Sequence, residues 1–547
     1  MKYLLWIIEN TKGIRGNTLS RIAVGITRVA CGLLVVWLSK YFIDVTISTG
    51  TSEDISLMIG LLLSMVLAVI LLRQAYYYMT ISANTRQTNI IRLRIFSTLF
   101  SRRLYDEYEL HSGDVTSRMS KDIETVSNIT TEIIPLMIVT GTQLIGAFLL
   151  MQSMDGKLAC ALIIITPLTL LFGKLISRHL RQMTLDIRQD ESRIQMRIQE
   201  SMEQNAVLRA LGCEEWLTDR LDSLQIQLKG NMMRRARFIA AMRVIMGAVF
   251  GLGYMITFIW GGLQLRSGLI TIGVLTSFLQ LVGQIQNPIL NLMNMLPQLI
   301  QATASIDRLQ ELESGRIEDG QSPSLEEQQL SLQGKSMGVR FTDASFHYAS
   351  GDRDILHHFC HDFKPASKTA LMGPTGIGKT TLFRLMLSLI KLDEGSITIY
   401  HHQGESKISE YTRQHFVFVP QGNTLMSGTI RYNLLLANPD VSDEELRDVL
   451  HTAVADFVYQ LPEGIDTELG EHGSGLSEGQ SQRIAIARGL LRPGSVLLLD
   501  EISASLDEQT EQLLYQRLFT KYPQKTMIFI THRPKVSELC DEVLNLA

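Results

Sequence analysis

Long apolar stretches in the first part of this chain restrict its possible folds more than any other feature. The core of a membrane needs about 20 apolar residues per helix, and backbone polar groups inside it must pair with one another because no water is available. Stretches of that length therefore predict six membrane-spanning helices. They cover roughly residues 22–44, 56–78, 133–153, 158–177, 238–262 and 270–295, and the last of them carries the most polar residues.

Charged residues between these stretches predict the orientation. The connections at 46–54 and 151–156 are short and carry no Lys or Arg, whereas those at 80–132 and 178–237 are long and rich in both. Because positive loops stay in the cytoplasm, the termini and the two long connections are expected there. We expect these connections to be membrane helices that continue far into the cytoplasm and return after a small turn.

Four polar residues within or near the spans have two interpretations each. Arg28 and Arg243 could face a functional cavity, because a charge inside a membrane is costly. They could equally lie near helix ends, with the charged group reaching the membrane surface. Gln143 and Gln280 could form hydrogen bonds between helices or line a cavity.

Composition separates the chain into two parts. Of the 547 residues, 46% are apolar and 19% charged, but the average combines the apolar first part with a second part of ordinary soluble composition. Residues 1–314 are predicted to form the membrane domain, 315–336 a polar linker, and 337–547 a soluble α/β domain that begins with alternating strand residues at 339–348. The expected fold class is multidomain, with an all-α polytopic membrane domain followed by an α/β domain.

Several functions are disfavoured by the same composition. The net charge of −4 gives no indication of nucleic-acid binding. Five scattered cysteines without a Cys-x-x-Cys pair favour a reduced compartment and indicate no metal site. No cleavable signal peptide is expected, and the roughly 20 residues before the first span are too few for a protease domain.

The segment 373–381, Gly-Pro-Thr-Gly-Ile-Gly-Lys-Thr-Thr, is typical of a phosphate-binding loop. An apolar strand is predicted before it at 369–372, and a helix after it at 381–390. Glycines allow the backbone N–H groups to converge on phosphate oxygens, and the helix N-terminus adds a favourable dipole. Lys379 is expected to reach the β- and γ-phosphates, and the Thr380 hydroxyl to ligate Mg²⁺. The nucleotide-binding residues predicted here are Gly373, Thr375, Gly376, Gly378, Lys379, Thr380 and Thr381.

A second buried strand, at 496–501, ends in two carboxylates. In P-loop folds the acid at the end of such a strand holds Mg²⁺, so Asp500 is expected to bind the metal, through water. Glu501 is the candidate general base that accepts a proton from the attacking water. A simple helix-capping acid is the alternative for this pair.

A second anion site is predicted at 473–488. Ser477 and Gln480 form an S-x-x-Q capping box, and the helix that follows is expected to stop at Arg492-Pro493. Because the domain already has one phosphate loop, this helix end is expected to serve the nucleotide of another copy. An ordinary capped helix is the alternative.

These motifs together resemble the nucleotide-binding domain of ABC transporters. The resemblance rests on the phosphate loop, Gln421, Leu476–Gln480, Val496–Glu501, Ser505–Asp507 and His532, which occur in the family's order. It extends to the membrane part, where 112–118 and 200–215 are similar to intracellular loops of exporter half-transporters, and 467–473 is similar to the segment that contacts such loops.

The resemblance implies further site residues. Tyr348 would stack on adenine, and Gln421 would contact Mg²⁺ and the attacking water. His532 would contact the γ-phosphate, and Asp507 would couple the two nucleotide sites. Ser477, Gly479 and Gln480 would bind the ATP held by a partner chain. The family has glycine where this chain has Glu478. We expect the site to be active, and a site that is weakened by this carboxylate is the alternative.

The expected function is ATP-driven export of a hydrophobic or amphipathic substrate, such as a lipid, drug or peptide, by a dimer of half-transporters in a bacterial inner membrane. The cofactors would be ATP and Mg²⁺, and the partners a second half-transporter, membrane lipids and the transported molecule, with no nucleic acid. A homodimer is favoured over a heterodimer. Uptake of a siderophore-like compound, and a regulator or gated channel that uses ATP only as a switch, are the alternatives.

Overall fold

The computed structural model describes residues 2–11, 13–102, 112–154, 156–314, 336–348, 354–402, 404–470 and 473–546. The chain forms two compact units. The helical unit contains the residues up to Phe100 together with Leu110–Ser314, and the sheet unit contains Ser101–Glu109 and Gly315–Ala547. The predicted linker at 315–336 lies outside the described residues except for Ser336.

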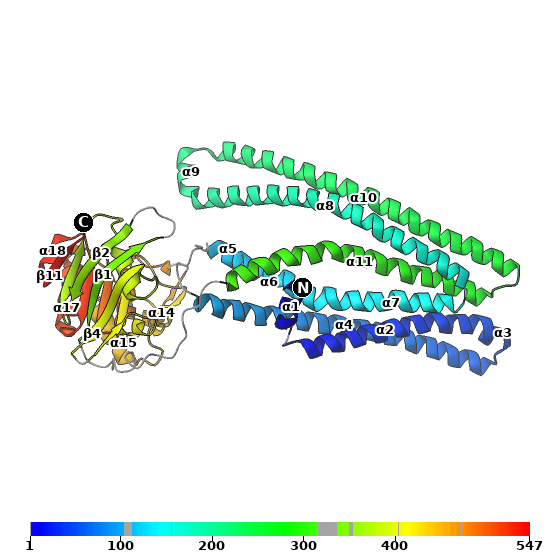
Figure 1. Ribbon diagram of the computed structural model, residues 1–547, viewed down its shortest axis with the longest axis horizontal. Helices are drawn as coiled ribbons and strands as arrows, with labels where there is room; N and C mark the ends of the chain where they lie inside the picture. The colour runs from blue at the N-terminus through cyan, green and yellow to red at the C-terminus, as the bar shows by residue number, and fades with distance from the viewer. Residues whose placement is uncertain are drawn as a thin grey trace. The chain divides into compact units, whose positions relative to one another are not determined.

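The helical unit consists of long helices, some of them interrupted by short π-helical turns (Figure 1). Its elements are α1 (Lys2–Asn10), α2 (Arg15–Tyr41), the π turn η1 (Phe42–Thr46), α3 (Ile47–Thr49), α4 (Ser52–Phe100), α5 (Ser112–Ser117), the π turn η2 (Arg118–Asp122), α6 (Ile123–Asn128), the π turn η3 (Ile129–Ile133), α7 (Ile134–Gln152), α8 (Gly156–Glu203), α9 (Asn205–Leu211), α10 (Glu214–Arg266) and α11 (Ile272–Glu313).

The predicted spans lie in α2, α4, α7, α8, α10 and α11, as expected. Within the described residues, four helical runs are long and apolar enough to cross a membrane, namely Arg15–Thr49, Ser52–Phe100, Gly113–Gln152 and Glu214–Arg266. The long connection at 178–237 also has the predicted form, because α8 and α10 continue far beyond their apolar parts and meet at the short α9.

The first short connection differs from the prediction. Residues 46–54 were expected to form a loop, but only Gly50 and Thr51 lie outside helices. The hydroxyls of Ser48 and Thr49 donate to the carbonyls of Asp44 and Val45, at 2.7 and 2.9 Å, and so pair within the helix itself. The helix therefore continues nearly to the start of α4.

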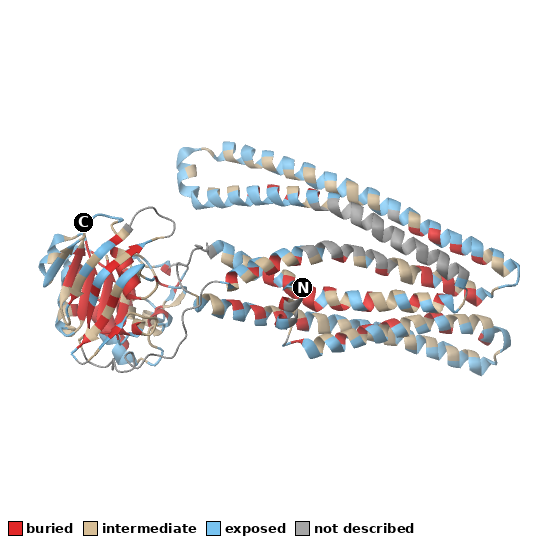
Figure 2. Ribbon diagram, in the orientation of Figure 1, coloured by how far each residue is buried: buried red, intermediate tan, exposed pale blue. Residues whose placement is uncertain are grey.

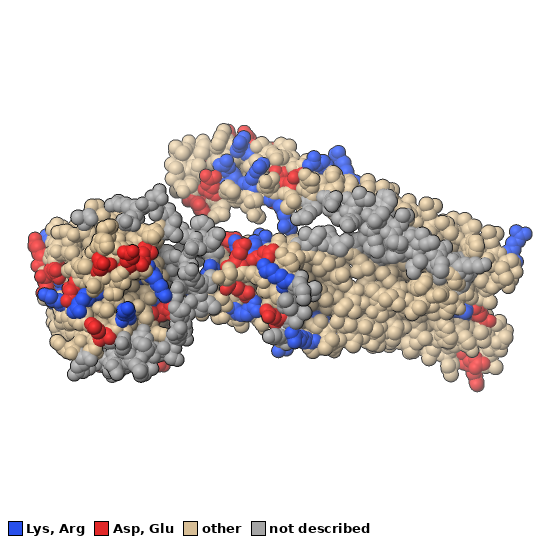
Figure 3. Space-filling model, in the orientation of Figure 1, with Lys and Arg blue, Asp and Glu red and all other residues tan. Residues whose placement is uncertain are grey.

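The surface of the helical unit is apolar along its length. Leu63, Leu67 and Leu71 of α4 are exposed by more than half, and Figure 2 shows mostly exposed or intermediate residues along α4 and α10. On the face seen in Figure 3, charged side chains gather near α5, α6 and α9, and the surface along α2, α4 and α7 carries few of them. An apolar surface of this extent suits lipid rather than water.

Two of the polar residues noted in the spans make contacts between helices. The Gln143 amide donates to the carbonyl of Gln284 at 3.2 Å, which joins α7 to α11. The Arg28 guanidinium lies 5.7 Å from the centre of the Tyr76 ring and so joins α2 to α4. Arg243 and Gln280 are exposed.

The sheet unit is an α/β structure with a small antiparallel sheet beside a parallel one. Its strands are β1 (Gly338–His347), β2 (Asp354–Phe363), β3 (Lys368–Met372), β4 (Glu394–His401), β5 (Gly404–Lys407), β6 (Phe416–Val419), β7 (Gly428–Thr429), β8 (Glu468–Leu469), β9 (Val496–Asp500), β10 (Thr526–Ile530) and β11 (Glu542–Asn545). Its helices are α13 (Lys379–Met386), α14 (Ile430–Leu435), α15 (Asp443–Thr452), α16 (Glu478–Leu490), α17 (Glu508–Lys521) and α18 (Pro534–Glu538), with 3₁₀ turns at Thr412–His415, Asp456–Gln460 and Gly464–Asp466.

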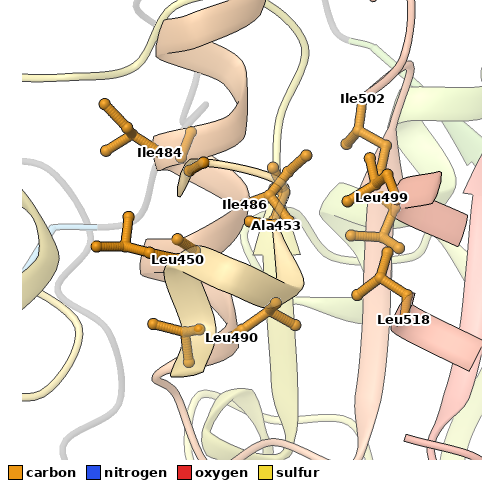
Figure 4. Packing of buried hydrophobic residues seen from close by; sticks show 14 of the residues in the cluster. Leu450, Ala453, Ile484, Ile486, Leu490, Leu499, Ile502 and Leu518 are labelled. Carbon is orange, nitrogen blue, oxygen red and sulfur yellow. The ribbon is translucent and has the colours of Figure 1, made fainter. Parts of the chain in front are cut away.

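The parallel sheet has the strand order β11-β3-β10-β9-β6, and the antiparallel sheet the order β2-β1-β4-β5. All residues of β9 and β10 and the three central residues of β3 are buried, as expected for strands covered on both faces. Figure 4 shows the apolar cluster that fastens α15 and α16 to this sheet, with Ile486 and Leu499 in its interior. This packing fixes the strand ends that carry the candidate site.

Candidate functional site

The glycine-rich segment 373–378 connects the end of β3 to the start of α13, as predicted from the sequence. Gly373 and Gly378 have φ angles of 144° and 107°, which L-residues with a side chain rarely adopt. A Cβ atom at Gly378 would lie 2.4 Å from the Ile355 side chain, and one at Gly373 would lie 2.7 Å from the Leu546 carbonyl oxygen. Both conformation and space therefore require glycine. Gly376 also has a positive φ, of 84°, and Thr375 is exposed in the loop.

The helix after this loop is shorter than predicted. It was expected to continue to Ile390, but α13 ends at Met386. Ser388 has a φ of 52°, and the Leu389 N–H donates to the Arg384 carbonyl at 2.9 Å, which closes the helix. Leu387 and Leu389 instead line a cavity of about 350 Å³ with Phe418 of β6. Packing against the sheet therefore overrides the helical spacing of the apolar residues.

Lys379, the first residue of α13, points back over the loop. Its ammonium group donates to the carbonyls of Gly373 and Pro374, at 2.7 and 3.1 Å. The residue is only 7% exposed, and within the described residues no carboxylate forms an ion pair with it, although its charge acts on the Asp500 carboxyl. A buried cation above a nest of backbone N–H groups is a strong attractor for phosphate.

The register of the parallel strands brings two distant segments to this loop. Ile530 lies beside Leu371 of β3 on one side and beside Asp500 of β9 on the other. The residues that follow these three positions therefore emerge at the same edge of the sheet. Ligand sites of open α/β sheets lie at this carboxyl edge.

Asp500 lies at the end of β9, where it contacts the loop helix. The Thr380 hydroxyl donates to the Asp500 carboxylate at 3.1 Å. Burial raises the pKa of the Asp500 carboxyl, and the hydrogen bond from Thr380 opposes this rise. Two hard oxygen ligands at this distance fit Mg²⁺, which proteins hold with one or two carboxylates while substrate phosphates and water complete its shell. Among the described residues, no group of three His, Cys, Asp or Glu that could hold a metal by itself occurs.

Glu501 connects the two remaining candidate catalytic residues. Its carboxylate accepts a hydrogen bond from the Gln421 amide at 2.6 Å, and its other oxygen lies 3.3 Å from His532 Nε2. The same His532 atom lies 3.3 Å from the Lys379 ammonium. Glu501 has a φ of 45°, a strained value for a residue with a side chain, and its N–H donates to the Ile530 carbonyl. Strain of this kind is maintained at functional sites when the surrounding structure supports it.

Tyr348 follows β1 and lies against the loop helix. Its hydroxyl is 3.3 Å from the Thr381 hydroxyl and accepts a hydrogen bond from Arg384 at 3.1 Å. Its ring packs edge-on against Phe346. The predicted adenine-stacking residue is therefore held beside the phosphate loop, and Arg384 is a neighbour that the motifs did not reveal.

The predicted capping box begins α16. The Ser477 hydroxyl accepts from the Gln480 N–H at 3.3 Å, and the Gln480 side chain accepts from the Ser477 N–H at 2.9 Å. A Cβ at Gly479 would lie 2.8 Å from the Ser505 carbonyl oxygen, so a glycine is needed there. Ser477 and Glu478 are both exposed. The helix ends at Leu490, before Arg492-Pro493, as predicted.

Asp507 caps α17, where its carboxylate accepts hydrogen bonds from the N–H and hydroxyl of Thr510. These hydrogen bonds lower the pKa of Asp507. The segment before it is held by Arg533, which donates to the carbonyls of Ala504 and Leu506 and to the buried Glu511. Arg533 was not predicted from the sequence, although its position directly after the predicted site residue His532 indicated that it lies near the site.

The structure therefore separates the predicted residues into two groups. Gln421, Lys379, Asp500, Glu501 and His532 meet around the phosphate loop. Within the described residues, no hydrogen bond or ion pair joins Ser477, Gly479, Gln480 or Asp507 to that loop. In the predicted contact segment at 467–473, Glu471 and His472 lie outside the described residues.

Comparisons with known proteins concern both parts of the chain. Residues 22–289 match the family model "ABC transporter transmembrane region", and residues 356–504 match the model "ABC transporter". The chain is 28% identical over 435 residues to a multidrug resistance ABC transporter ATP-binding and permease protein of Lactococcus lactis, covering 78% of this chain and 71% of that protein. It is 26% identical over 471 residues to a fatty acid ABC transporter ATP-binding/permease protein of Mycobacterium bovis, covering 84% and 73% respectively.

A solved structure shares the fold of nearly the whole chain. The structure of a bacterial Atm1-family ABC exporter with ATP bound matches with a TM-score of 0.82 and 21% identity, over 98% of this chain and 94% of that one.

Proposed function

Because this chain belongs to the ABC transporters, with a transmembrane region and an ABC ATPase domain joined as in exporter half-transporters, we propose that two identical copies form one transporter with two shared ATP sites. The protein is a multi-pass membrane protein and an ATPase coupled to transport, and its function is ATP-driven export. Half-transporters of this kind act as dimers. We place the domain boundary within 315–336 and the ATPase domain on the cytoplasmic side, since the basic connections favour that side.

The residues around the phosphate loop have distinct proposed roles. The loop and Lys379 hold the β- and γ-phosphates of ATP, and Tyr348 stacks on the adenine. Thr380, Asp500 and Gln421 hold Mg²⁺, which when bound neutralises developing phosphate charge. Glu501 accepts a proton from water as the water oxygen bonds to the γ-phosphorus and the bond to ADP breaks. His532 contacts the γ-phosphate.

One observation supports the sharing of sites between copies. Ser477 and Gly479 stand at the exposed N-terminus of α16, a position suited to anions, and make no hydrogen bond to the phosphate loop of their own chain within the described residues. We propose that they bind the γ-phosphate of the partner's ATP. Binding of ATP then stabilises the closed pair of ATPase domains, and hydrolysis releases it.

Mixed dimers test this arrangement. One copy carries Lys379→Ala and the other Ser477→Arg, and the two copies are purified together through different tags. If sites are shared, both defects fall in one site, and we expect roughly half of the wild-type ATPase rate because the second site is intact.

The matched control places both substitutions in one copy beside a wild-type partner. Each shared site then contains one defect, so the ATPase rate should fall to a small fraction of the wild-type rate. The reverse ranking of the two dimers, with the single-copy double variant more active, would mean that each chain hydrolyses ATP with its own residues. Failure to recover any tagged pair would refute the homodimer.

The substrate is proposed to be hydrophobic or amphipathic. The spans contain few charges, and the relatives named above are a multidrug and a fatty acid transporter. We expect the ATPase rate of the protein in lipid vesicles to rise severalfold with long-chain fatty acids or cationic amphipathic dyes. Hydrophilic sugars and amino acids serve as the control. Stimulation by that control group alone would contradict the proposal.

A further inference from the structure

The membrane helices are joined into three hairpins at the end opposite to α5 and α9 (Figure 1). Residues 50–51 join α3, in which α2 continues through η1, to α4; a short connection joins α7 to α8, and residues 267–271 join α10 to α11. Connections this short prevent the two helices of a hairpin from separating there. With the orientation proposed above, this is the outer end, and an exit for substrate can open only between different hairpins.

A polar contact bridges two of these hairpins close to that end. Asp44, in the π turn η1 that follows α2, accepts a hydrogen bond from the Thr271 hydroxyl at 2.6 Å. Its second oxygen accepts from the Gly273 N–H at 2.8 Å. Thr271 and Gly273 form the start of α11, 227 and 229 residues away along the chain. The contact therefore fastens the α2/α4 hairpin to the α10/α11 hairpin.

The start of α11 is shaped for this carboxylate. A helix N-terminus has unpaired N–H groups and a partial positive charge, both of which favour an anion. Gly273 leaves the necessary space, because a Cβ there would lie 2.5 Å from the nearer Asp44 oxygen. Thr271 also caps α11 by accepting from the Val274 N–H. Asp44 and the cap of α11 thus form one connected group.

The rest of this interface is largely apolar. Below the contact, Val36 of α2 packs with Val274 and Phe278 of α11, and Ala147 and Met151 of α7 join the same cluster. Lipid chains can replace such contacts at little cost, because they are as apolar as the side chains. A charge-assisted hydrogen bond has no equivalent replacement in lipid. Asp44 therefore supplies the charged part of the directional attraction between these hairpins, beside the longer contact of the Ser277 hydroxyl with the Val36 carbonyl.

We propose that Asp44, held by Thr271 and Gly273, is a latch that keeps the outer end of the transporter closed until ATP-driven opening breaks it. The proposal rests on the export function proposed above. Asp44 acts as a positioning residue, since it holds two helices together and touches neither ATP nor substrate. Loss of the latch should raise the fraction of molecules that are open to the outside without nucleotide.

Labelling of a buried position measures this opening without a known substrate. Ser277 of α11 is completely buried, and its hydroxyl lies 3.4 Å from the Val36 carbonyl oxygen of α2. In a protein whose native cysteines are replaced by serine, Ser277→Cys becomes the reporter. A membrane-impermeant maleimide is added from outside, and the labelling rate is measured with and without ATP.

Asp44→Ala should raise the nucleotide-free labelling rate at least about tenfold, the effect of losing one net hydrogen bond to a charged group. Gly273→Ala should do the same from the other side of the contact, because its methyl group displaces the carboxylate. The matched control is Asp54→Ala. Asp54 lies at the same end, and among the described residues it accepts hydrogen bonds only from the neighbouring Thr51, so the labelling rate should stay at the parent value.

Parent-level labelling in both Asp44→Ala and Gly273→Ala would overturn the latch, as would an equal rise in all three variants. A separate experiment tests the export proposal. It places the Ser277→Cys reporter in a Glu501→Gln protein, which should bind ATP and hydrolyse it only slowly. Labelling should rise there when ATP is added. If the latch variants respond and ATP has no effect, the latch stands and the proposed ATP-driven opening fails.

Discussion

Replacing Glu501 by glutamine lowers ATP turnover by about two to four orders of magnitude, the usual contribution of a general base, and leaves ATP binding intact. The reason is the geometry of the carboxylate, which lies at the edge of the sheet beside Gln421 and His532. Glutamine has the same size and can still contact both neighbours, but it cannot accept the proton from water. The measurement is the ATPase rate of the purified protein, with nucleotide binding measured on the same sample.

Glu508→Gln is the matched control. Glu508 is exposed in the first turn of α17, where its carboxylate pairs with Lys535, and its substitution should leave turnover near the wild-type rate. ATPase activity of Glu501→Gln close to that of the wild type would remove Glu501 from the role of base. A loss of ATP binding in the same variant would mean instead that the carboxylate maintains the shape of the site.

Replacing Lys379 by alanine should weaken ATP binding by about two orders of magnitude, because a charge-assisted contact with phosphate is lost from a buried position. The ammonium is only 7% exposed and already lies over the carbonyls of Gly373 and Pro374. Its removal leaves the phosphates without their main cation and also loosens the loop. Isothermal titration with ATP measures the dissociation constant.

Lys407→Ala, at an exposed position at the end of β5, is the control for a general loss of positive charge and should bind ATP like the wild type. An unchanged dissociation constant in Lys379→Ala would show that the backbone N–H groups alone hold the nucleotide. Thermal unfolding of both variants separates weaker binding from loss of the folded state.

Most of the candidate site could be predicted from the sequence because its elements are local. The phosphate loop depends on glycines spaced within a few residues, and the capping box on Ser477 and Gln480 three positions apart. Both conformations result from short-range backbone geometry. The same holds for β9, whose continuous apolar run and terminal acids were visible as a pattern.

Local patterns were insufficient where packing decided the conformation. The apolar spacing after Lys379 predicted a helix to Ile390, yet the chain leaves the helix at Met386 so that Leu387 and Leu389 can face the sheet. At 46–54, charge and polarity predicted a loop, and the side-chain hydroxyls of Ser48 and Thr49 instead pair within a continued helix. Neither outcome depends on composition alone.

The sequence by itself determined that this chain crosses a membrane repeatedly and carries an ATP-binding α/β domain, because segment length, apolarity and glycine spacing act over short distances along the chain. Only the tertiary structure decided which distant residues meet. The strand register brings His532 within 3.3 Å of both Lys379 and Glu501, and the helix packing brings Asp44 to the start of α11. Such contacts depend on how buried surfaces pack against one another, and the spacing of residues along the sequence does not predict that packing.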